Sequence, residues 1–198
     1  MIEEVVAAIR ARRPVVLPTD TVYGLCVDAF HEDAVRRLYR LKGREDMQPT
    51  ALLVADEEVL VEAIPELRGY AILRGPYTLI LPNPARRFPW LTGGRPQTIG
   101  VRVPTLPADA AAVLQQVGAV AATSANLPGG PDPRTVEEIP DELLAGCAAV
   151  VDVGPLPGSP STVIDLTGAE PAVVREGAVS AEDALSAVGA AVRGSAPR

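Results

Sequence analysis

The sequence predicts an α/β domain with a mixed β-sheet, and three observations support this fold class. Short β-branched apolar runs alternate with longer stretches in which apolar residues recur every three or four positions. The alternation is irregular, and strand-like runs follow one another late in the chain, which is typical of a mixed sheet. Hydrophobic residues make up 47% of the 198 positions, enough for one substantial core. We therefore expect one domain over residues 1–191 and a frayed C-terminal tail over 192–198.

The first 44 residues are expected to form a helix, a strand, a loop and a second helix. Residues 2–13 have helical apolar spacing and end at Pro14, which cannot continue a helix. The run VVLP (15–18) predicts a buried strand, and TDTVYG (19–24) a polar loop. Residues 30–44 predict the second helix, with Gly43 as its C-cap. Its expected inner face consists of Ala34, Val35, Leu38 and Leu41.

The remaining elements follow from the same periodicities. Strands are expected at 50–55, 77–82, 97–104, 119–125, 147–154, 161–167 and 172–177. Helices are expected at 56–64, 108–118 and 180–192. The segment LPGGPDPRT (127–135) predicts an irregular excursion between two strands.

The overall charge and the termini exclude several classes of protein. A net charge of −7 argues against nucleic acid as the main ligand, so tRNA binding is expected to be weak or absent. The N-terminus lacks the pattern of a signal peptide, and no apolar run reaches the roughly 18 residues of a membrane span. Cys26 and Cys147 are far apart and predict free thiols. These features predict a cytoplasmic protein without a membrane segment.

Several common cofactor and catalytic motifs are absent from the sequence. No G-x-x-x-x-G-K-[ST] loop and no G-x-G-x-x-G fingerprint is present. The only histidine, His31, cannot build a multi-histidine metal site and is expected to precede or cap the second helix. No protein metal site is therefore predicted.

Four polar clusters follow predicted strands or helices, where ligand sites of α/β proteins gather. They are PTDTVYGL (18–25), LKGRED (41–46), TIGVRVP with TSAN (98–104 and 123–126), and GSPSTVID with VVREG (158–165 and 173–177). Each cluster alone is also compatible with an ordinary turn or a solvated helix end. Together they supply four cations and several hydroxyl groups, a set that suits a polyanion such as ATP.

Lys42 is the only lysine in a chain with 17 arginines. An arginine would serve nearly as well at the end of a helix. A compact ammonium with rotatable donors has a different geometry from a planar guanidinium, so its retention suggests a specific contact. One lysine could also have been retained by chance.

The chain resembles the YrdC/TsaC family of threonylcarbamoyl-AMP synthases over about residues 3–190. The motifs that carry the resemblance are PTDTVYGL, the K-x-R of LKGR, RGPYTLIL, VRVP, TSAN and STVID followed by VVREG, in the family's order. The resemblance implies a twisted open sheet flanked by helices around a large cavity. It also implies a nucleotidyltransferase that condenses L-threonine, bicarbonate and ATP, with Mg²⁺, to threonylcarbamoyl-AMP and pyrophosphate. A downstream transferase complex then modifies tRNA with the product.

The resemblance also implies roles for individual residues. Lys42 and Arg44 face the phosphates and carry catalysis. The implied L-threonine contacts are Thr21, Tyr23, Arg102 and Ser161, with Arg102 on the carboxylate. The implied ATP contacts are Arg44, Gln48, Thr98, Ser124, Asn126 and Arg175.

Two segments depart from the family pattern. The run EDMQPT places Gln48 where asparagine is common and Pro-Thr where Pro-Leu is common, and Asp132 stands where serine is common. Three alternatives to the synthase are open. One is a nucleotide- or RNA-binding module that does not catalyse synthesis, and another is a related carbamoyl-adenylate enzyme without threonine specificity. The third is a purely structural subunit, against which the polar clusters argue.

Overall fold

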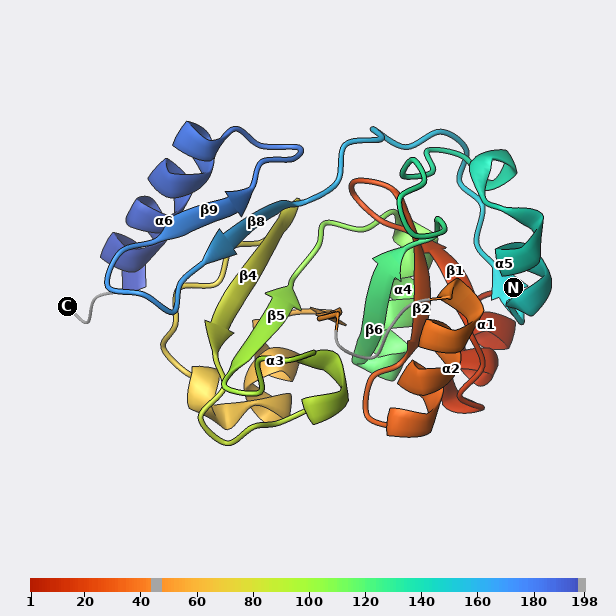
Figure 1. Ribbon diagram of the computed structural model, residues 1–198, viewed down its shortest axis with the longest axis horizontal. Coiled ribbons are helices and arrows are strands. Elements are labelled where there is room, and N and C mark those ends of the chain that lie inside the picture. The colour runs from red at the N-terminus through yellow and green to blue at the C-terminus, as the bar shows by residue number, and fades with distance from the viewer. Residues whose placement is uncertain (44–47, 196–198) are drawn as a thin grey trace.

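The computed structural model describes residues 1–43 and 48–195, and it has the α/β architecture with a mixed sheet that the sequence predicts. Nine strands form one twisted sheet in the order β7-β1-β2-β6-β3-β5-β4-β8-β9 (Figure 1). The strands are β1 (Val15–Pro18), β2 (Tyr23–Asp28), β3 (Ala51–Val54), β4 (Tyr77–Pro82), β5 (Thr98–Arg102), β6 (Ala119–Ser124), β7 (Ala149–Val150), β8 (Thr162–Asp165) and β9 (Ala172–Arg175).

Six α-helices and three 3₁₀ turns surround this sheet within the described residues. The helices are α1 (Ile2–Arg10), α2 (Glu32–Lys42), α3 (Glu57–Ala63), α4 (Ala108–Val117), α5 (Asp141–Gly146) and α6 (Ala181–Ser195). The 3₁₀ turns are η1 (Pro65–Leu67), η2 (Pro89–Leu91) and η3 (Val136–Glu138). The N-terminal helix and α5 lie at one end of the molecule, and α6 lies at the other (Figure 1).

Alternate residues of the central strands enter two separate cores, one on each face of the sheet. Val16 of β1 and Leu52 of β3 belong to the larger core, which includes side chains of α2. Val15 and Leu53 belong to the second core, under α1 and α4. Burial on both faces explains why these strands read as unbroken apolar runs in the sequence.

The pairing combines both strand directions. The β1–β7, β3–β5 and β4–β8 pairs are parallel, whereas the β1–β2, β2–β6, β3–β6, β4–β5 and β8–β9 pairs are antiparallel. The chain leaves β7 at one edge of the sheet and reaches β8 near the other edge through residues 151–161, which cross the molecule (Figure 1).

The structure differs from the predicted elements in four places. Strand β2 begins inside the expected loop 19–24 and continues to Asp28, because β1 and β6 pair with it on both sides. Strand β7 has only two residues, whereas a strand over 147–154 was expected. Helix α5 was not predicted, and α6 continues to Ser195, beyond its expected end at Val192.

Candidate active site

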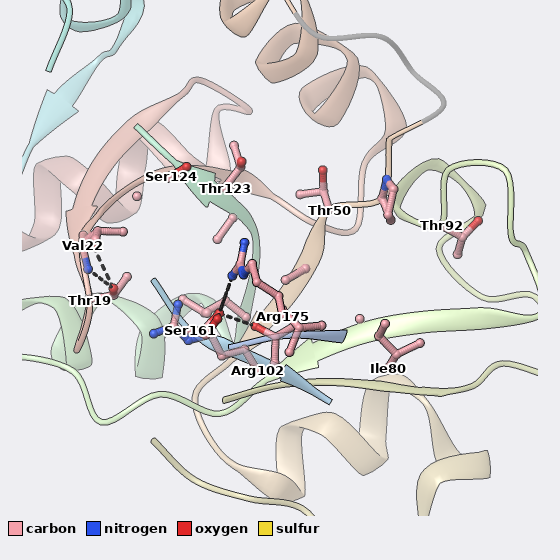
Figure 2. A pocket seen from close by; sticks show the side chains of 18 of the residues that line it. Thr19, Val22, Thr50, Ile80, Thr92, Arg102, Thr123, Ser124, Ser161 and Arg175 are labelled. Atoms are coloured by element: carbon pink, nitrogen blue, oxygen red, sulfur yellow. Dashed lines mark hydrogen bonds between the residues drawn. The ribbon is translucent and has the colours of Figure 1, made fainter. Parts of the chain in front are cut away.

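A cavity of about 340 Å³ opens on the sheet face that α1 and α4 cover further along the strands (Figure 2). Its floor is a row of small residues: Ala122 of β6 pairs with Ala51 of β3, and Gly100 of β5 lies beside Ala51. Larger side chains at these positions would occupy the space above the sheet. The row therefore explains why the cavity lies here and is not filled by core side chains.

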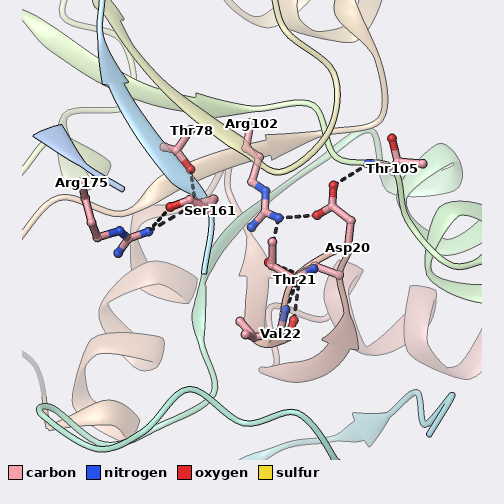
Figure 3. Close-up of polar contacts among 9 residues, drawn as sticks. Asp20, Thr21, Val22, Thr78, Arg102, Thr105, Ser161 and Arg175 are labelled. Carbon is pink, nitrogen blue, oxygen red and sulfur yellow. Dashed lines mark hydrogen bonds and ion pairs between the residues drawn. The ribbon is translucent and has the colours of Figure 1, made fainter. Parts of the chain in front are cut away.

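Arg102 lies at the end of β5 and lines the cavity, although it is only 9% exposed. Its Nη2 donates to the Asp20 carboxylate and to Thr21 Oγ1, the latter at 2.8 Å (Figure 3). Its Nε is buried and has no partner among the described residues. Burial lowers the pKa of the guanidinium, Asp20 opposes that shift, and Arg175 adds to it. The cation is thus paired on one side and keeps an unpaired donor.

Arg175, Ser161 and Thr78 form a second polar group on the cavity wall (Figure 3). Arg175 Nη2 donates to the Ser161 carbonyl at 2.8 Å and lies 3.3 Å from Ser161 Oγ. The hydroxyl groups of Ser161 and Thr78 are 2.8 Å apart. Two guanidinium groups from opposite sides of Ser161 thus face one cavity, and they can neutralise an anionic ligand.

Lys42 is 5% exposed, and its ammonium is enclosed by the turn that follows β6. It donates to the Ser124 carbonyl, to Asn126 Oδ1 at 2.9 Å and to Thr123 Oγ1 at 3.2 Å. Three acceptors that converge on one nitrogen suit an ammonium and not a planar guanidinium, which accounts for the single lysine. Lys42 is not itself among the lining residues, whereas its partners Thr123 and Ser124 are, and its expected contact with phosphate stays a prediction.

The S-x-N pair is held in place by the same network. Ser124 Oγ donates to Asn126 Oδ1 at 2.8 Å. Asn126 Nδ2 donates to the Gly130 carbonyl at 2.6 Å and reaches Asp132 Oδ1 at 3.4 Å. The excursion over 127–135 thus folds back on Asn126, and Asp132 contributes a structural contact.

Of three further predicted residues, one lines the cavity, one lies outside its lining and one lies outside the described residues. Thr98 lines the cavity together with Arg102, Ser124, Ser161 and Arg175. Gln48 is exposed and outside the cavity lining, and Arg44 lies outside the described residues.

Thr21 and Tyr23 are completely buried and are not among the residues that line the cavity, and their expected contacts with threonine stay predictions. Thr21 bonds instead to Arg102 and to Thr19 Oγ1, the latter at 2.9 Å. The Tyr23 hydroxyl lies 2.9 Å from Asp152 Oδ1 and accepts from the Val153 N–H at 3.0 Å. Tyr23 therefore ties β2 to the segment that crosses the molecule.

Several residues at or behind the cavity had no predicted role, among them Thr78, Arg95 and Asp20. Thr78 and Arg95 line it, and Asp20 holds Arg102 from behind. A threonine inside the apolar strand YTLILP was a signal for Thr78, and a cation in the turn TGGRPQ was a signal for Arg95. Asp20 belongs to the cluster PTDTVYGL, which the sequence singled out, but only the fold shows that its partner is Arg102.

The described residues contain no metal cluster, and burial raises the pKa of both thiols. No carboxylate lines the cavity within residues 1–43 and 48–195, and no group of three or more potential ligands gathers elsewhere in them. Burial raises the pKa of the Cys26 thiol to about 12 and that of Cys147 to about 11. Among the helices of this part of the chain, none has the length and apolar character needed to cross a bilayer.

Known proteins share this fold and sequence pattern. The Sua5/YciO/YrdC family model, described as telomere recombination, matches residues 7–177. A Mycobacterium tuberculosis protein provisionally named threonylcarbamoyl-AMP synthase is 37% identical over 93% of this chain and 87% of its own length. The Bacillus subtilis threonylcarbamoyl-AMP synthase is 34% identical over 95% of this chain, which spans 56% of that protein.

Solved structures agree with these relatives. Pyrococcus abyssi Sua5 complexed with L-threonine matches with a TM-score of 0.82 and 31% identity, over 95% of this chain and 57% of that one. Escherichia coli YciO matches with a TM-score of 0.77 and 31% identity, over 90% of both chains. The family match covers most of the cavity-forming strands, and so the chain belongs to the Sua5/YciO/YrdC family.

Proposed function

We propose that this chain is a threonylcarbamoyl-AMP synthase that condenses L-threonine, bicarbonate and ATP to threonylcarbamoyl-AMP, pyrophosphate and water. The observation that carries the proposal is the cavity in which Arg102 and Arg175 flank Ser161, in a chain that matches threonine-bound Sua5. The names of the relatives from B. subtilis and P. abyssi support the same activity. The product serves threonylcarbamoyladenosine modification of tRNA in the cytoplasm, through a separate transferase.

The two ends of the cavity suit the two substrates. The end near Arg102, Ser161 and Arg175 offers guanidinium and hydroxyl donors for an amino-acid carboxylate. The end near Thr98 and Ser124 holds the nucleotide, with Arg95 at its rim. The chemistry then takes place above the row of small residues between these ends.

The reaction needs orientation and charge neutralisation more than a protein nucleophile. The neutral threonine amine attacks the carbon of CO₂ derived from bicarbonate, losing a proton and forming a carbamate. A carbamate oxygen attacks the α-phosphorus of ATP, and the bond to pyrophosphate breaks. Fixed cations lower the barrier by stabilising the charge that develops on the phosphoryl oxygens.

The described residues do not form a site for Mg²⁺, because the cavity lining contains cations and hydroxyl groups but no carboxylate. We therefore treat Mg²⁺ as part of the substrate: it enters bound to the phosphates of ATP.

The direct test is pyrophosphate release by the purified protein with MgATP, omitting threonine or bicarbonate in turn, with the nucleotide product identified by mass spectrometry. Release that needs both substrates, together with threonylcarbamoyl-AMP, is the expected result. ATP binding without that joint dependence would favour a nucleotide-binding module. Release with another amine in place of threonine would favour a carbamoyl-adenylate enzyme of different specificity.

A further inference from the structure

We propose that Asp20 is a positioning and specificity residue that holds Arg102 and restricts this end of the cavity to singly charged carboxylates, against phosphates. This inference rests on the proposed function, because it concerns how the threonine site of that enzyme discriminates between the carboxylate of the amino acid and the polyphosphate of ATP. Asp20 does not line the cavity, and it acts through Arg102.

The side chain of Asp20 is buried to nearly the same extent as that of Arg102, which it contacts. Its side chain is 11% exposed, and that of Arg102 is 10% exposed. One carboxylate oxygen accepts from Arg102 Nη2, and the other accepts from the Thr105 N–H at 3.0 Å, so the chain after β5 anchors it (Figure 3). Because both oxygens are bonded, the carboxylate is fixed at the point where it meets Arg102 Nη2.

The contacts of Asp20 involve one nitrogen of the Arg102 guanidinium. Nη2 is occupied by Asp20 and Thr21, whereas the buried Nε has no partner in the described part of the chain. Within the described residues, Asp20 is the carboxylate that pairs with this cation.

The charges at this end favour a single negative charge. Arg102 and Arg175 contribute two positive charges, and Asp20 removes one of them. A threonine zwitterion has one carboxylate to place here and no net charge. A pyrophosphate or triphosphate group carries several negative charges and would be repelled by the Asp20 carboxylate behind Arg102. Asp20 therefore keeps the polyphosphate of ATP away from the threonine end.

Removal of the charge should separate these two effects. In Asp20→Asn the side chain keeps its size and can still accept from the Thr105 N–H. We expect the Kd for L-threonine to rise by about tenfold as Arg102 loses its charged partner, and the Kd for inorganic pyrophosphate to fall by about tenfold. If Asp20 had a purely structural role, Asp20→Asn would weaken the binding of both ligands together. Opposite changes in the two Kd values are therefore the diagnostic result.

The experiment is a calorimetric titration of L-threonine and of pyrophosphate into the full chain and its variants. Asp20→Glu keeps the negative charge but displaces it. The affinity for L-threonine should therefore fall, while the affinity for pyrophosphate should equal that of the wild type. Asp33→Asn is the matched control, because Asp33 forms an exposed ion pair with Arg12. Unchanged affinities in Asp20→Asn, or parallel losses of both ligands, would overturn the proposal.

A measurement on the wild type keeps the proposal testable if Asp20→Asn does not fold. Pyrophosphate should displace ATP without displacing bound L-threonine, and equal displacement of both would refute the discrimination. A wild-type protein that binds no threonine at all would instead contradict the proposed function, so the two failures are distinguishable.

Discussion

Lys42 shows how a single residue type is selected by local geometry. Its ammonium meets a backbone carbonyl, a hydroxyl group and an amide oxygen within one turn. In this structure it holds the wall of the cavity in shape, at the point where Thr123 and Ser124 line the cavity.

Both a neutral and a planar replacement of Lys42 should impair the enzyme. We expect Lys42→Met and Lys42→Arg to lower kcat/KM by about 100-fold, because the S-x-N turn loses its central donor or must move to admit a larger head group. Lys42→Met should also destabilise the protein by about 1–3 kcal/mol, since buried acceptors lose their partner. Steady-state kinetics and thermal unfolding would measure both effects.

Arg40→Met is the control, because Arg40 lies in the last turn of the same helix and is exposed. It should leave kcat/KM and stability unchanged. A folded Lys42→Met protein with full activity would remove Lys42 from the site.

Tyr23 illustrates the opposite case, in which a residue of a functional motif serves the fold. We expect Tyr23→Phe to lower the free energy of unfolding by about 1–2 kcal/mol, because the Val153 N–H and Asp152 lose a buried partner. Threonine affinity should stay within about twofold of the wild type, since the ring does not reach the cavity. Urea unfolding would measure the stability, and calorimetry would measure the affinity for threonine. A large loss of threonine affinity would show that Tyr23 contacts the ligand.

At the scale of secondary structure, the sheet makes room for the ligands by placing small residues side by side. Ala122, Ala51 and Gly100 come from three neighbouring strands, and Ile80 of β4 pairs with Gly100 next in the row. The room therefore depends on register, and one residue of slippage in any strand would fill it.

Substitutions at Gly100 should distinguish the effect of filling the cavity from an effect on folding. A Cβ there would lie 3.8 Å from Thr78 Cγ2 and 3.9 Å from Ala51 Cα, which is ordinary van der Waals contact. We expect Gly100→Ala to fold and bind ligands, whereas Gly100→Leu should fold but lose ATP and threonine binding because its side chain occupies the cavity. Circular dichroism and calorimetry would distinguish these outcomes, and tight binding by a folded Gly100→Leu protein would contradict the location of the site.

Elements with a strong internal period were predictable from the sequence, whereas elements defined by their neighbours were not. Helix α2 and its C-cap Gly43, in the left-handed conformation, match the prediction, although Tyr39 and Lys42 are buried where Leu41 was expected to be. Strand β2 was missed because YGLCVD has no clear alternation and is specified by pairing with β1 and β6.

The same distinction applies to the site. Arg102, Ser124, Ser161 and Arg175 were predicted to act together, and they share one cavity. The contact of Thr78 with Ser161 arises from the parallel pairing of β4 with β8, in which Tyr77 lies opposite Thr162. No local pattern encodes that register, so the contact of Thr78 with Ser161 could not be predicted, although a threonine inside an apolar strand was a signal for Thr78.

At the scale of the whole molecule, the ligands should bind the folded chain as one unit. The lining extends from Thr19 to Arg175, and every strand from β2 to β9 in the order of the sheet contributes to it. Ligands that bind only this assembled cavity stabilise the entire fold.

We therefore expect L-threonine with MgATP to raise Tm cooperatively, in a single transition. At about 100 times Kd a ligand adds about 2.7 kcal/mol, and each kcal/mol raises Tm by about 2–4 °C in a protein of this size. Differential scanning calorimetry would record the shift, with D-threonine as the control ligand. Two separate transitions, only one of them shifted, would show that the halves of the sheet unfold independently.

The crossing segment 151–161 has a consequence for the order in which the protein matures on the ribosome. It delivers Ser161 and, through β8 and β9, Arg175 to a cavity whose other walls come from residues 19–124. A nascent chain that lacks these last strands has an exposed β4 edge and an unfinished substrate site. Neither substrate can assist the early stages of folding, and catalytic competence arrives late, when the final third of the chain has been synthesised.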